Sequence, residues 1–412
     1  MRILIVTQYF WPENFRINDL AEGLVQLGHE VTVLTGKPNY PGGRFAEGYG
    51  FFRRARERWG AIDIVRAPLL PRGQGHWLQL TLNYVSFALF ASLLGPLRCR
   101  GNFDAIFVYE PSPVTVGLPA LAMKAMTGAP ILFWVQDLWP ESLSATGAVR
   151  SPVLLAAARW LVRRIYAGCD RILIQSEAFV APIRALGVPA ERIVYYPNSA
   201  EEFYRPLQRA QARLPLELPA GFRIMFAGNI GAAQGFETIL AAAGRLRDHR
   251  DIQWLIVGEG RQLQWVRDEI ALRGLSETVR LVGPQAPDSM PGWFAHADVM
   301  LVSLRADPIF AFTIPAKVQS YMACGRPIVA SLDGEGARVV RDSGAGLAAP
   351  ADDPEALARA VLELYRMPAS EREAMGARGR AYFERHFERG ALLKRLVSLM
   401  EEVRQEQGAC GS

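Results

Sequence analysis

The chain has 412 residues, of which 50% are hydrophobic and 21% are charged. This balance is typical of a well-packed globular protein and excludes an intrinsically disordered chain, and the length predicts two domains. The net charge is only +5, and the sequence has no helix-turn-helix, zinc-finger or RNP-like pattern, so we expect no nucleic acid partner.

The first residues, MRILIVTQYFWPEN, predict a strand rather than a signal peptide, because one arginine precedes a short apolar run that lacks a cleavage-type motif. The cysteines stand far apart, with no C-x-x-C spacing, which argues against a disulfide framework or a structural metal site. They are Cys99, Cys169, Cys324 and Cys410. Both observations favour a cytoplasmic protein.

Short apolar runs alternate with helical patterns along the first half of the chain. We expect strands over residues 3–7, 31–35, 62–66, 105–109, 131–135, 171–174 and 192–195. We expect helices over residues 16–27, 113–126, 151–167 and 176–186. This alternation predicts an α/β fold whose parallel sheet is covered by helices on both faces.

Residues 77–97, WLQLTLNYVSFALFASLLGPL, have no charged side chain. A membrane-spanning helix needs about 20 apolar residues, but polar side chains interrupt this segment. Three possibilities stay open: a spanning helix, a helix half in the protein and half in a membrane interface, and a buried core helix. Clumped arginines would be attracted to an anionic membrane face. They are Arg53, Arg54, Arg56 and Arg58, then Arg159, Arg163 and Arg164.

Pro-rich and charged residues over 197–221 predict a linker. A second series of strands and helices follows, with strand segments FRIMFAGN, IQWLIVG, VRLVG and DVMLVS. Pro315 predicts the start of a short helix that ends at Ala323, and a strand follows over residues 327–330. The chain is expected to end with helices over 354–365 and 370–405.

Ligands of open α/β sheets bind beyond the carboxyl ends of the strands. The first strand of the second half leads into GNIGAAQG, residues 228–235, where glycines and a helix N-terminus favour an anion. The spacing matches neither the dinucleotide-binding nor the P-loop pattern, so neither NAD binding nor ATP hydrolysis follows. Arg261 and Ser303 also follow strands. Lys317 lies two residues after Pro315 and could reach the same anion.

Aromatic residues mixed with carboxylates follow the strands of the first half, in YFWPENFR, TGKPNYPGG, YEPSP and VQDLWPES. This mixture is typical of sites that hold sugar rings and hydroxyls. The acids there are Glu13, Glu110, Asp137 and Glu141, and Asp137 is the best candidate because it ends a buried apolar strand. The histidines have no acid or cysteine at ligand-like spacing, so we expect no metal.

These motifs, together with LGHEVTVLTG at 27–36 and SYMACGRPIVAS at 320–331, resemble those of the retaining family-4 glycosyltransferases of GT-B fold. The resemblance implies two Rossmann-like, doubly wound parallel-sheet domains that face each other across a cleft. It places an acceptor-binding domain at 1–200 and a nucleotide-sugar-binding domain at 201–381. A terminal helix at 382–412 would cross back to the first domain.

Within the family, TQYFWPEN, TGKPNYP and VQDLWPES resemble the bacterial enzymes that add N-acetyl-fucosamine or related sugars to O-antigen and capsule precursors. The resemblance implies a UDP-sugar donor and a polyprenyl-diphosphate-linked saccharide acceptor at the cytoplasmic membrane face. The implied donor-binding residues are Gly228, Asn229, Gly231, Gln234, Gly258, Arg261, Ser303, Thr313, Lys317 and Ser320. The implied acceptor-binding residues are Glu13, Asn14, Arg16, Lys37 and Tyr40.

The sequence departs from the family pattern at several polar anchors. Asn229 and Gln234 stand where an arginine and a lysine usually hold the diphosphate, and Gln136 replaces a histidine. Phe312 and Ser320 stand where a pair of glutamates is usual. Lys317 and Arg261 could restore the positive charge, with Asp137, Gln136 and Glu110 as the implied catalytic residues and no cofactor.

Two other functions are compatible with the same fold. A nucleotide-sugar 2-epimerase would need a set of carboxylates and a histidine around the sugar, and the scarcity of histidine disfavours it. A non-catalytic nucleotide-binding partner subunit is the other alternative, and the missing glutamates are the reason to consider it.

Overall fold

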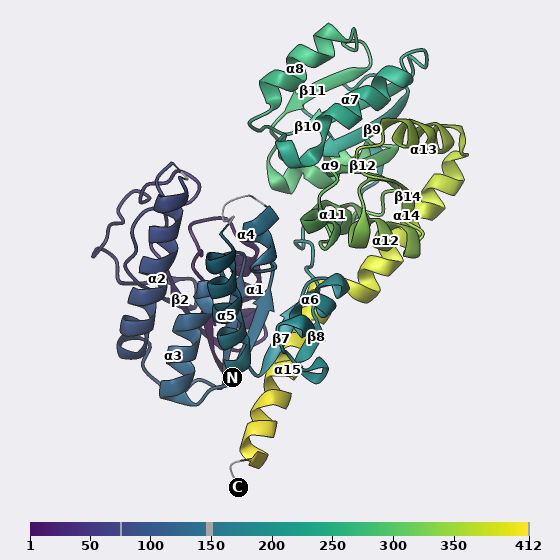
Figure 1. Cartoon of the computed structure of the whole chain (residues 1–412). Helices are drawn as coiled ribbons and strands as arrows, with labels where there is room; N and C mark the ends of the chain where they lie inside the picture. Colours follow the sequence, from purple (N-terminus) through teal and green to yellow (C-terminus); the bar gives the residue numbers. More distant parts are fainter. Residues whose placement is uncertain (75, 146–150, 411–412) are drawn as a thin grey trace. The chain divides into compact units, whose positions relative to one another are not determined.

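The computed structural model describes residues 1–74, 76–145 and 151–410. The chain divides into two compact units (Figure 1). The N-terminal unit contains Met1–Tyr196 and Gly390–Ser412, and the C-terminal unit contains Pro197–Arg389. Each unit is an α/β structure built on one largely parallel sheet.

The N-terminal unit has an eight-stranded sheet in the order β3-β4-β2-β1-β5-β6-β7-β8, in which only β3 and β4 pair antiparallel. The central strands β5 and β6 are buried along their whole length because helices cover both faces of the sheet. The strands are β1 (Arg2–Val6), β2 (Glu30–Thr35), β3 (Arg56–Trp59), β4 (Ile62–Arg66), β5 (Ala105–Glu110), β6 (Ile131–Val135), β7 (Arg171–Ile174) and β8 (Ile193–Tyr195).

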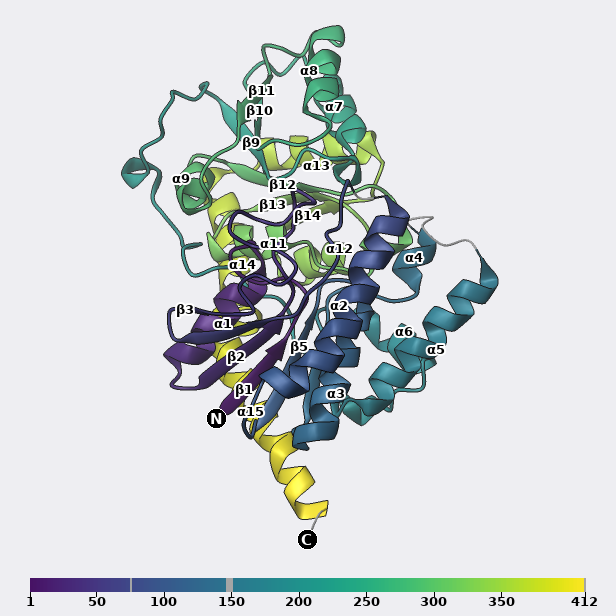
Figure 2. The same ribbon diagram turned by 90° about the vertical axis from the view of Figure 1, so that its left-hand side faces the viewer.

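One face of this sheet carries α2 (Trp77–Arg98), α3 (Gly117–Thr127) and α5 (Pro152–Gly168), which lie side by side (Figure 2). Close packing depends on a small residue, because a Cβ atom on Gly117 of α3 would lie 2.3 Å from the Ile165 side chain of α5. The shorter helices of the unit are α4 (Glu141–Ala145) and α6 (Val180–Ala185).

The opposite face carries α1 (Arg16–Gln26) and α15 (Arg389–Cys410). Apolar side chains recur along α1 at helical spacing and face the sheet. Among them, Ile17, Leu20 and Leu24 are buried. The last helix of the chain therefore belongs to the core of the first unit, where Leu396 is fully buried.

This packing of α15 predicts a stability effect. Leu396→Ala should lower the free energy of local unfolding by about 2–5 kcal/mol, because it leaves a cavity between α15 and the sheet. Hydrogen exchange of peptides from β1 and β2 would measure the loss. The exposed neighbour Lys394 provides the control, since Lys394→Ala should change the stability by less than about 0.5 kcal/mol. Equal exchange rates in the two variants would contradict the packing.

The seven strands predicted in the first half are confirmed, to within one or two residues at their ends. In this sheet, β3 was not predicted because its sequence RERW is mostly charged. It lies at the sheet edge, where charged side chains are tolerated, and Arg58 pairs with Asp63 of β4 at 2.9 Å.

The C-terminal unit has a six-stranded, fully parallel sheet in the order β11-β10-β9-β12-β13-β14. The strands are β9 (Phe222–Ala227), β10 (Ile252–Val257), β11 (Val279–Gly283), β12 (Val299–Ser303), β13 (Ile328–Ser331) and β14 (Gly346–Ala349). The four predicted strand segments and the strand predicted over 327–330 are thereby confirmed.

Helices again cover both faces of this sheet. Alternate residues of β9 point to opposite sides, so that Phe222 and Ile224 join one core cluster and Met225 joins the other. The helices are α7 (Phe236–Arg245), α8 (Leu263–Leu272), α9 (Met290–Ala295), α10 (Pro308–Ala311), α11 (Ala316–Ala323), α12 (Gly334–Asp342), α13 (Pro354–Arg366) and α14 (Ala369–His386).

The single terminal helix predicted over 370–405 is wrong. The structure has two helices there, α14 and α15, with Phe387 and Glu388 between them. Phe387 is fully buried in the C-terminal unit and has ψ 1°, which departs from helical geometry, so α14 ends at this residue. The chain then returns to the N-terminal unit from Gly390.

The predicted linker over 197–221 packs against the C-terminal unit. The ring of Tyr204 stacks on Phe294 with centroids 5.9 Å apart, and Gln319 donates a hydrogen bond to the Asn198 carbonyl at 2.8 Å. This segment is therefore part of the second unit and begins it.

Candidate functional site

Two strand-end loops of the C-terminal unit approach each other closely at glycines. The loop after β9 begins at Gly228, and the loop after β10 begins at Gly258, with φ of +134° and +140°. A Cβ atom on Gly258 would lie 2.0 Å from the Gly228 carbonyl oxygen. Only glycine fits this contact. The Ile230 N–H donates to the Glu259 carbonyl at 2.7 Å, which fixes the two loops together.

Lys317, on the first turn of α11, reaches over this glycine contact. Its Nζ lies 3.8 Å from the ring centroid of Phe226 at the end of β9. A Cβ atom on Gly228 would lie 2.7 Å from Lys317 Cε, so this glycine leaves room for the lysine. Burial lowers the pKa of Lys317 to about 7. Within the described parts of the chain, the ammonium group has the aromatic face as a neighbour but no carboxylate or carbonyl partner.

The other donor-site residues predicted from sequence lie in the loops after β9 and β10, at the end of β12, or on or just before α11. Asn229 and Arg261 are exposed, while Ser303 is buried and its Oγ lacks a hydrogen-bond partner among the described residues. Gln234 accepts a hydrogen bond from the Gly231 N–H at 3.2 Å and so closes the glycine loop on itself.

Two predicted hydroxyl groups already have local partners. Thr313 donates to the Phe310 carbonyl at 3.2 Å, and Ser320 donates to the Ala316 carbonyl within α11 at 3.1 Å. These hydroxyls stabilise the turn and helix that present Lys317. Sequence spacing gave no sign of this role.

In the N-terminal unit, β5 and β6 bring Glu110, Gln136 and Asp137 together at their carboxyl ends. Glu110 is fully buried, and its Oε2 accepts a long hydrogen bond of 3.5 Å from the Asp137 N–H. Its Oε1 and the Gln136 Nε2 are buried with no hydrogen-bond partner among the described residues. Such unpaired groups are costly unless a ligand or water meets them.

The two carboxyl groups titrate differently because their surroundings differ. Burial, and secondly the charge of Asp137, raise the pKa of Glu110 well above its usual range, which favours the protonated form of this carboxyl group. Burial also raises the pKa of Asp137 to about 6, but hydrogen bonds with Ser142 and Ser112 oppose the shift. Asp137 is therefore mostly ionised at pH 7.

Glu13 organises a second cluster in this unit. Its Oε1 accepts hydrogen bonds from the N–H groups of Asn39 and Tyr40, both at 2.7 Å. Burial raises the pKa of Glu13 to about 7 against these hydrogen bonds. The half-exposed ring of Tyr40 lies 4.9 Å from the Arg72 guanidinium carbon.

Arg72 was not predicted from the sequence, although it follows β4 and the strand-end rule would have found it. Asn14 is exposed and Arg16 is partly exposed on the first turn of α1. Lys37 is buried, and its ammonium donates hydrogen bonds to the carbonyls of Arg53 and Arg54. Lys37 therefore holds the 53–54 segment, and burial lowers its pKa to about 8.

Comparisons with known proteins agree with this architecture. The family described as "Glycosyl transferase 4-like domain" matches residues 14–199, and "Glycosyl transferases group 1" matches residues 221–367. Similar relatives include the putative colanic acid biosynthesis glycosyl transferase WcaI of Escherichia coli K12, which is 28% identical over 338 residues, 79% of this chain and 82% of WcaI. The probable glycosyltransferase WbjE of Pseudomonas aeruginosa is 25% identical over 317 residues, 75% of this chain and 78% of WbjE.

Solved structures with the same fold include HepE of Anabaena in complex with UDP, with a TM-score of 0.70 and 14% identity over 98% of this chain and all of HepE. WaaG, described as a glycosyltransferase involved in lipopolysaccharide biosynthesis, has a TM-score of 0.65 and 11% identity, with 97% of this chain and 99% of WaaG covered. These low identities establish the fold alone. Because each unit also matches its own family, the chain belongs to the family-4 glycosyltransferases of GT-B fold.

Proposed function

We propose that this protein transfers a sugar from a UDP-sugar donor to a polyprenyl-diphosphate-linked saccharide during surface polysaccharide synthesis, with retention at the anomeric carbon. The proposed sugar is an N-acetylated deoxyhexosamine such as N-acetyl-fucosamine. The names of WcaI and WaaG support the pathway, and UDP in HepE supports the nucleotide. The observation that carries the proposal is the ammonium group of Lys317, which lies at glycine-lined strand ends without an anionic partner among the described residues.

In this proposal the diphosphate of the donor lies at the strand ends of the C-terminal unit. Gly228, Gly231 and Gly258 allow the backbone to approach it, and Lys317 and Arg261 supply positive charge. The buried Ser303 hydroxyl would gain the partner that it lacks. These groups take the charge-neutralising role that a metal has elsewhere, so transfer should persist in EDTA.

The reaction breaks the bond between the anomeric carbon and the diphosphate oxygen and forms a bond from that carbon to an acceptor oxygen on the same face. The acceptor hydroxyl passes its proton to a phosphate oxygen, and UDP leaves. Asp137 and Gln136 orient hydroxyl groups, and Glu110 holds the Asp137 loop through its hydrogen bond with the Asp137 N–H. Orientation of this kind lowers a barrier by several kcal/mol, at most about 7–11.

The acceptor would bind near the Glu13 cluster. Tyr40 and Arg72 offer an aromatic face and a cation at the surface, and Asn14 and Arg16 offer polar groups beside them. Glu13 and Lys37 act less directly, because both are buried and hold the loops that carry these residues.

Helix α2 would rest on the membrane at which such an acceptor is found. Of the helices that the structure describes, α2 alone is long and apolar enough to cross a bilayer. Its inner face, however, is tied to the sheet, because Asn83 accepts a hydrogen bond from Gln8 at 2.7 Å and donates one to the Leu70 carbonyl. Spanning would break these bonds, so we propose an interfacial helix. The outer, exposed side chains are Trp77, Leu78, Leu82, Val85, Leu89, Leu93 and Leu97.

The double variant Leu89→Asp/Leu93→Asp should bind vesicles of bacterial lipids at least about tenfold more weakly, because each buried leucine contributes roughly 1.5–3 kcal/mol. Co-sedimentation measures this loss. The control is Leu272→Asp on α8, a still more exposed leucine of the C-terminal unit, which should bind as the unaltered protein does. Equal losses in both variants would contradict an interfacial role for α2.

The pH dependence of donor affinity should follow Lys317. With its pKa at about 7, the side chain is charged below pH 7 and neutral above it. A bound diphosphate favours the charged form, so binding above pH 7 must take up a proton. The dissociation constant of UDP-N-acetylglucosamine should therefore rise between pH 7 and 9, up to about tenfold per unit. The Lys317→Arg variant keeps its charge over this pH range, so calorimetry should show no such rise in its dissociation constant. If the dissociation constant of this variant still rises, another group is responsible.

Purified protein supplied with a panel of UDP-N-acetyl-hexosamines and a lipid-diphosphate-linked monosaccharide tests the activity itself. Mass spectrometry should show an acceptor heavier by one sugar together with released UDP. UDP binding without any transfer would favour a non-catalytic subunit. Interconversion of the donor without transfer would favour a 2-epimerase.

A further inference from the structure

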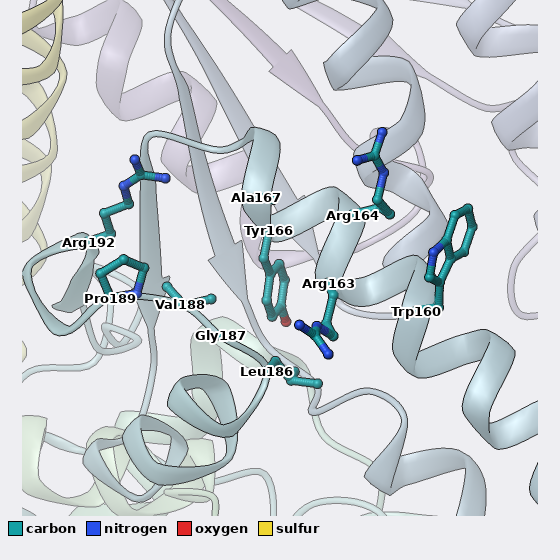
Figure 3. A pocket seen from close by; sticks show the side chains of 10 residues that line it. All are labelled: Trp160, Arg163, Arg164, Tyr166, Ala167, Leu186, Gly187, Val188, Pro189 and Arg192. Atoms are coloured by element: carbon teal, nitrogen blue, oxygen red, sulfur yellow. The ribbon is translucent and has the colours of Figure 1, made fainter.

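A basic cavity lies in the N-terminal unit, away from the strand-end residues described above. It has a volume of about 530 Å³ and lies between the second half of α5 and the loop that leads from α6 to η3 (Ala190–Arg192). Its lining includes Trp160, Arg163 and Tyr166 from α5. Figure 3 shows the Arg163 guanidinium and the Tyr166 hydroxyl pointing toward the same region beside Leu186.

The positive charge around this cavity is not neutralised. Arg163 and Arg164 come from α5 and Arg192 from the opposite side, and no acidic residue lines the cavity. In the part of the chain that the structure describes, none of these three arginine side chains forms an ion pair or a hydrogen bond. Guanidinium groups suit phosphate in particular, because they donate paired hydrogen bonds to its oxygens.

Exposed apolar side chains extend along α5 from the cavity to the first turn of the helix. Trp160 is 64% exposed, and Val153 and Leu154 on the first turn of α5 are 76% and 59% exposed. Tryptophan next to arginine is typical of side chains that meet a bilayer at its headgroup level. Helix α5 also lies on the same face of the sheet as α2 (Figure 2), so both present apolar side chains on one side of the unit.

We infer that the cavity between α5 and η3 binds the phosphate group of an anionic lipid, while the exposed apolar side chains of α5 contact its chains. A free phosphate or diphosphate would satisfy the arginines but would leave Trp160, Val153 and Leu154 in water. The inference rests on the proposed membrane location, and it adds a specific headgroup site to the general apolar contact of α2.

The test compares two double variants that remove the same charge. Arg163→Gln/Arg192→Gln alters the cavity, and Arg245→Gln/Arg267→Gln removes two exposed, unpaired arginines of the C-terminal unit. Vesicles of phosphatidylcholine, with and without phosphatidylglycerol, are the probes. Phosphatidylglycerol should increase the vesicle affinity of the unaltered protein, and in the cavity variant this increase should be smaller by a factor of about ten or more. In the control variant the increase should be unchanged. Thermal unfolding should show that both variants are folded.

Inorganic pyrophosphate at fixed ionic strength serves as a soluble competitor that helps to distinguish a lipid phosphate from a free phosphate. If the cavity binds a lipid phosphate, pyrophosphate should displace the unaltered protein from anionic vesicles. Equal losses in both double variants would show general attraction and overturn the inference. Pyrophosphate binding that the cavity variant loses, with vesicle binding unchanged, would assign a soluble ligand and overturn the lipid. If Leu89→Asp/Leu93→Asp loses vesicle binding and the cavity variant does not, the membrane location stands and this inference fails. No vesicle binding by the unaltered protein would overturn both.

Discussion

Replacing Lys317 with alanine should weaken UDP binding by about 10- to 100-fold, the effect of losing hydrogen bonds from a charged group to a phosphate. The ammonium group is held over the ring of Phe226 and beside Gly228, in a place where no protein carboxylate neutralises it among the described residues. Its charge is thus available to a ligand at the strand ends. Isothermal titration with UDP measures the loss.

Two variants make this result specific. Lys317→Arg retains the charge and should recover part of the affinity, although its planar group fits the narrow space over Gly228 less well. Lys394→Ala removes a charge from an exposed position on α15 and should leave UDP affinity unchanged. If Lys317→Ala binds UDP as tightly as the Lys394 variant does, Lys317 is not a diphosphate ligand.

The second large effect is expected at Asp137. Asp137→Asn preserves the size of the side chain but removes the carboxylate that would orient a sugar or acceptor hydroxyl. Because a small misplacement of the reacting groups costs about 100-fold in rate, kcat should fall by about that factor while UDP affinity stays the same. Steady-state transfer kinetics and titration with UDP together separate these two quantities.

The control for this experiment is Asp63→Asn, which removes an exposed carboxylate that pairs with Arg58 on the sheet edge. It should leave kcat within about twofold of the unaltered protein, as expected for a surface pair. A normal kcat for Asp137→Asn would assign the carboxylate to holding its loop, through the hydrogen bonds with Ser142 and Ser112.

The strands were predictable because a parallel sheet covered on both faces requires continuous apolar runs, such as ILFWV in β6. Two features that were not predicted also have physical reasons. β3 has a charged edge sequence, and the break between α14 and α15 is set by the burial of Phe387 in the second unit's core. Neither pattern is visible as apolar periodicity.

The sequence predicts which strand ends and which helix start carry the candidate residues, but not the surroundings of those residues. Strand-end reasoning identifies Asp137 and Gly228, since it needs only the sequence order of strands and loops, and the helix start at Pro315 identifies Lys317. It could not show that Lys317 lies on Phe226, 91 positions earlier in the printed sequence. Nor could it show that the Lys37 ammonium group already donates hydrogen bonds to two backbone carbonyls. Such facts depend on tertiary contacts.

A crystal structure of the protein with bound UDP tests the central claim most directly. The account predicts that the diphosphate lies at the carboxyl ends of β9 and β10, within hydrogen-bond distance of Lys317 Nζ and of the backbone between Gly228 and Gly231. A diphosphate bound elsewhere, with Lys317 still resting on Phe226 and touching no phosphate oxygen, would contradict it.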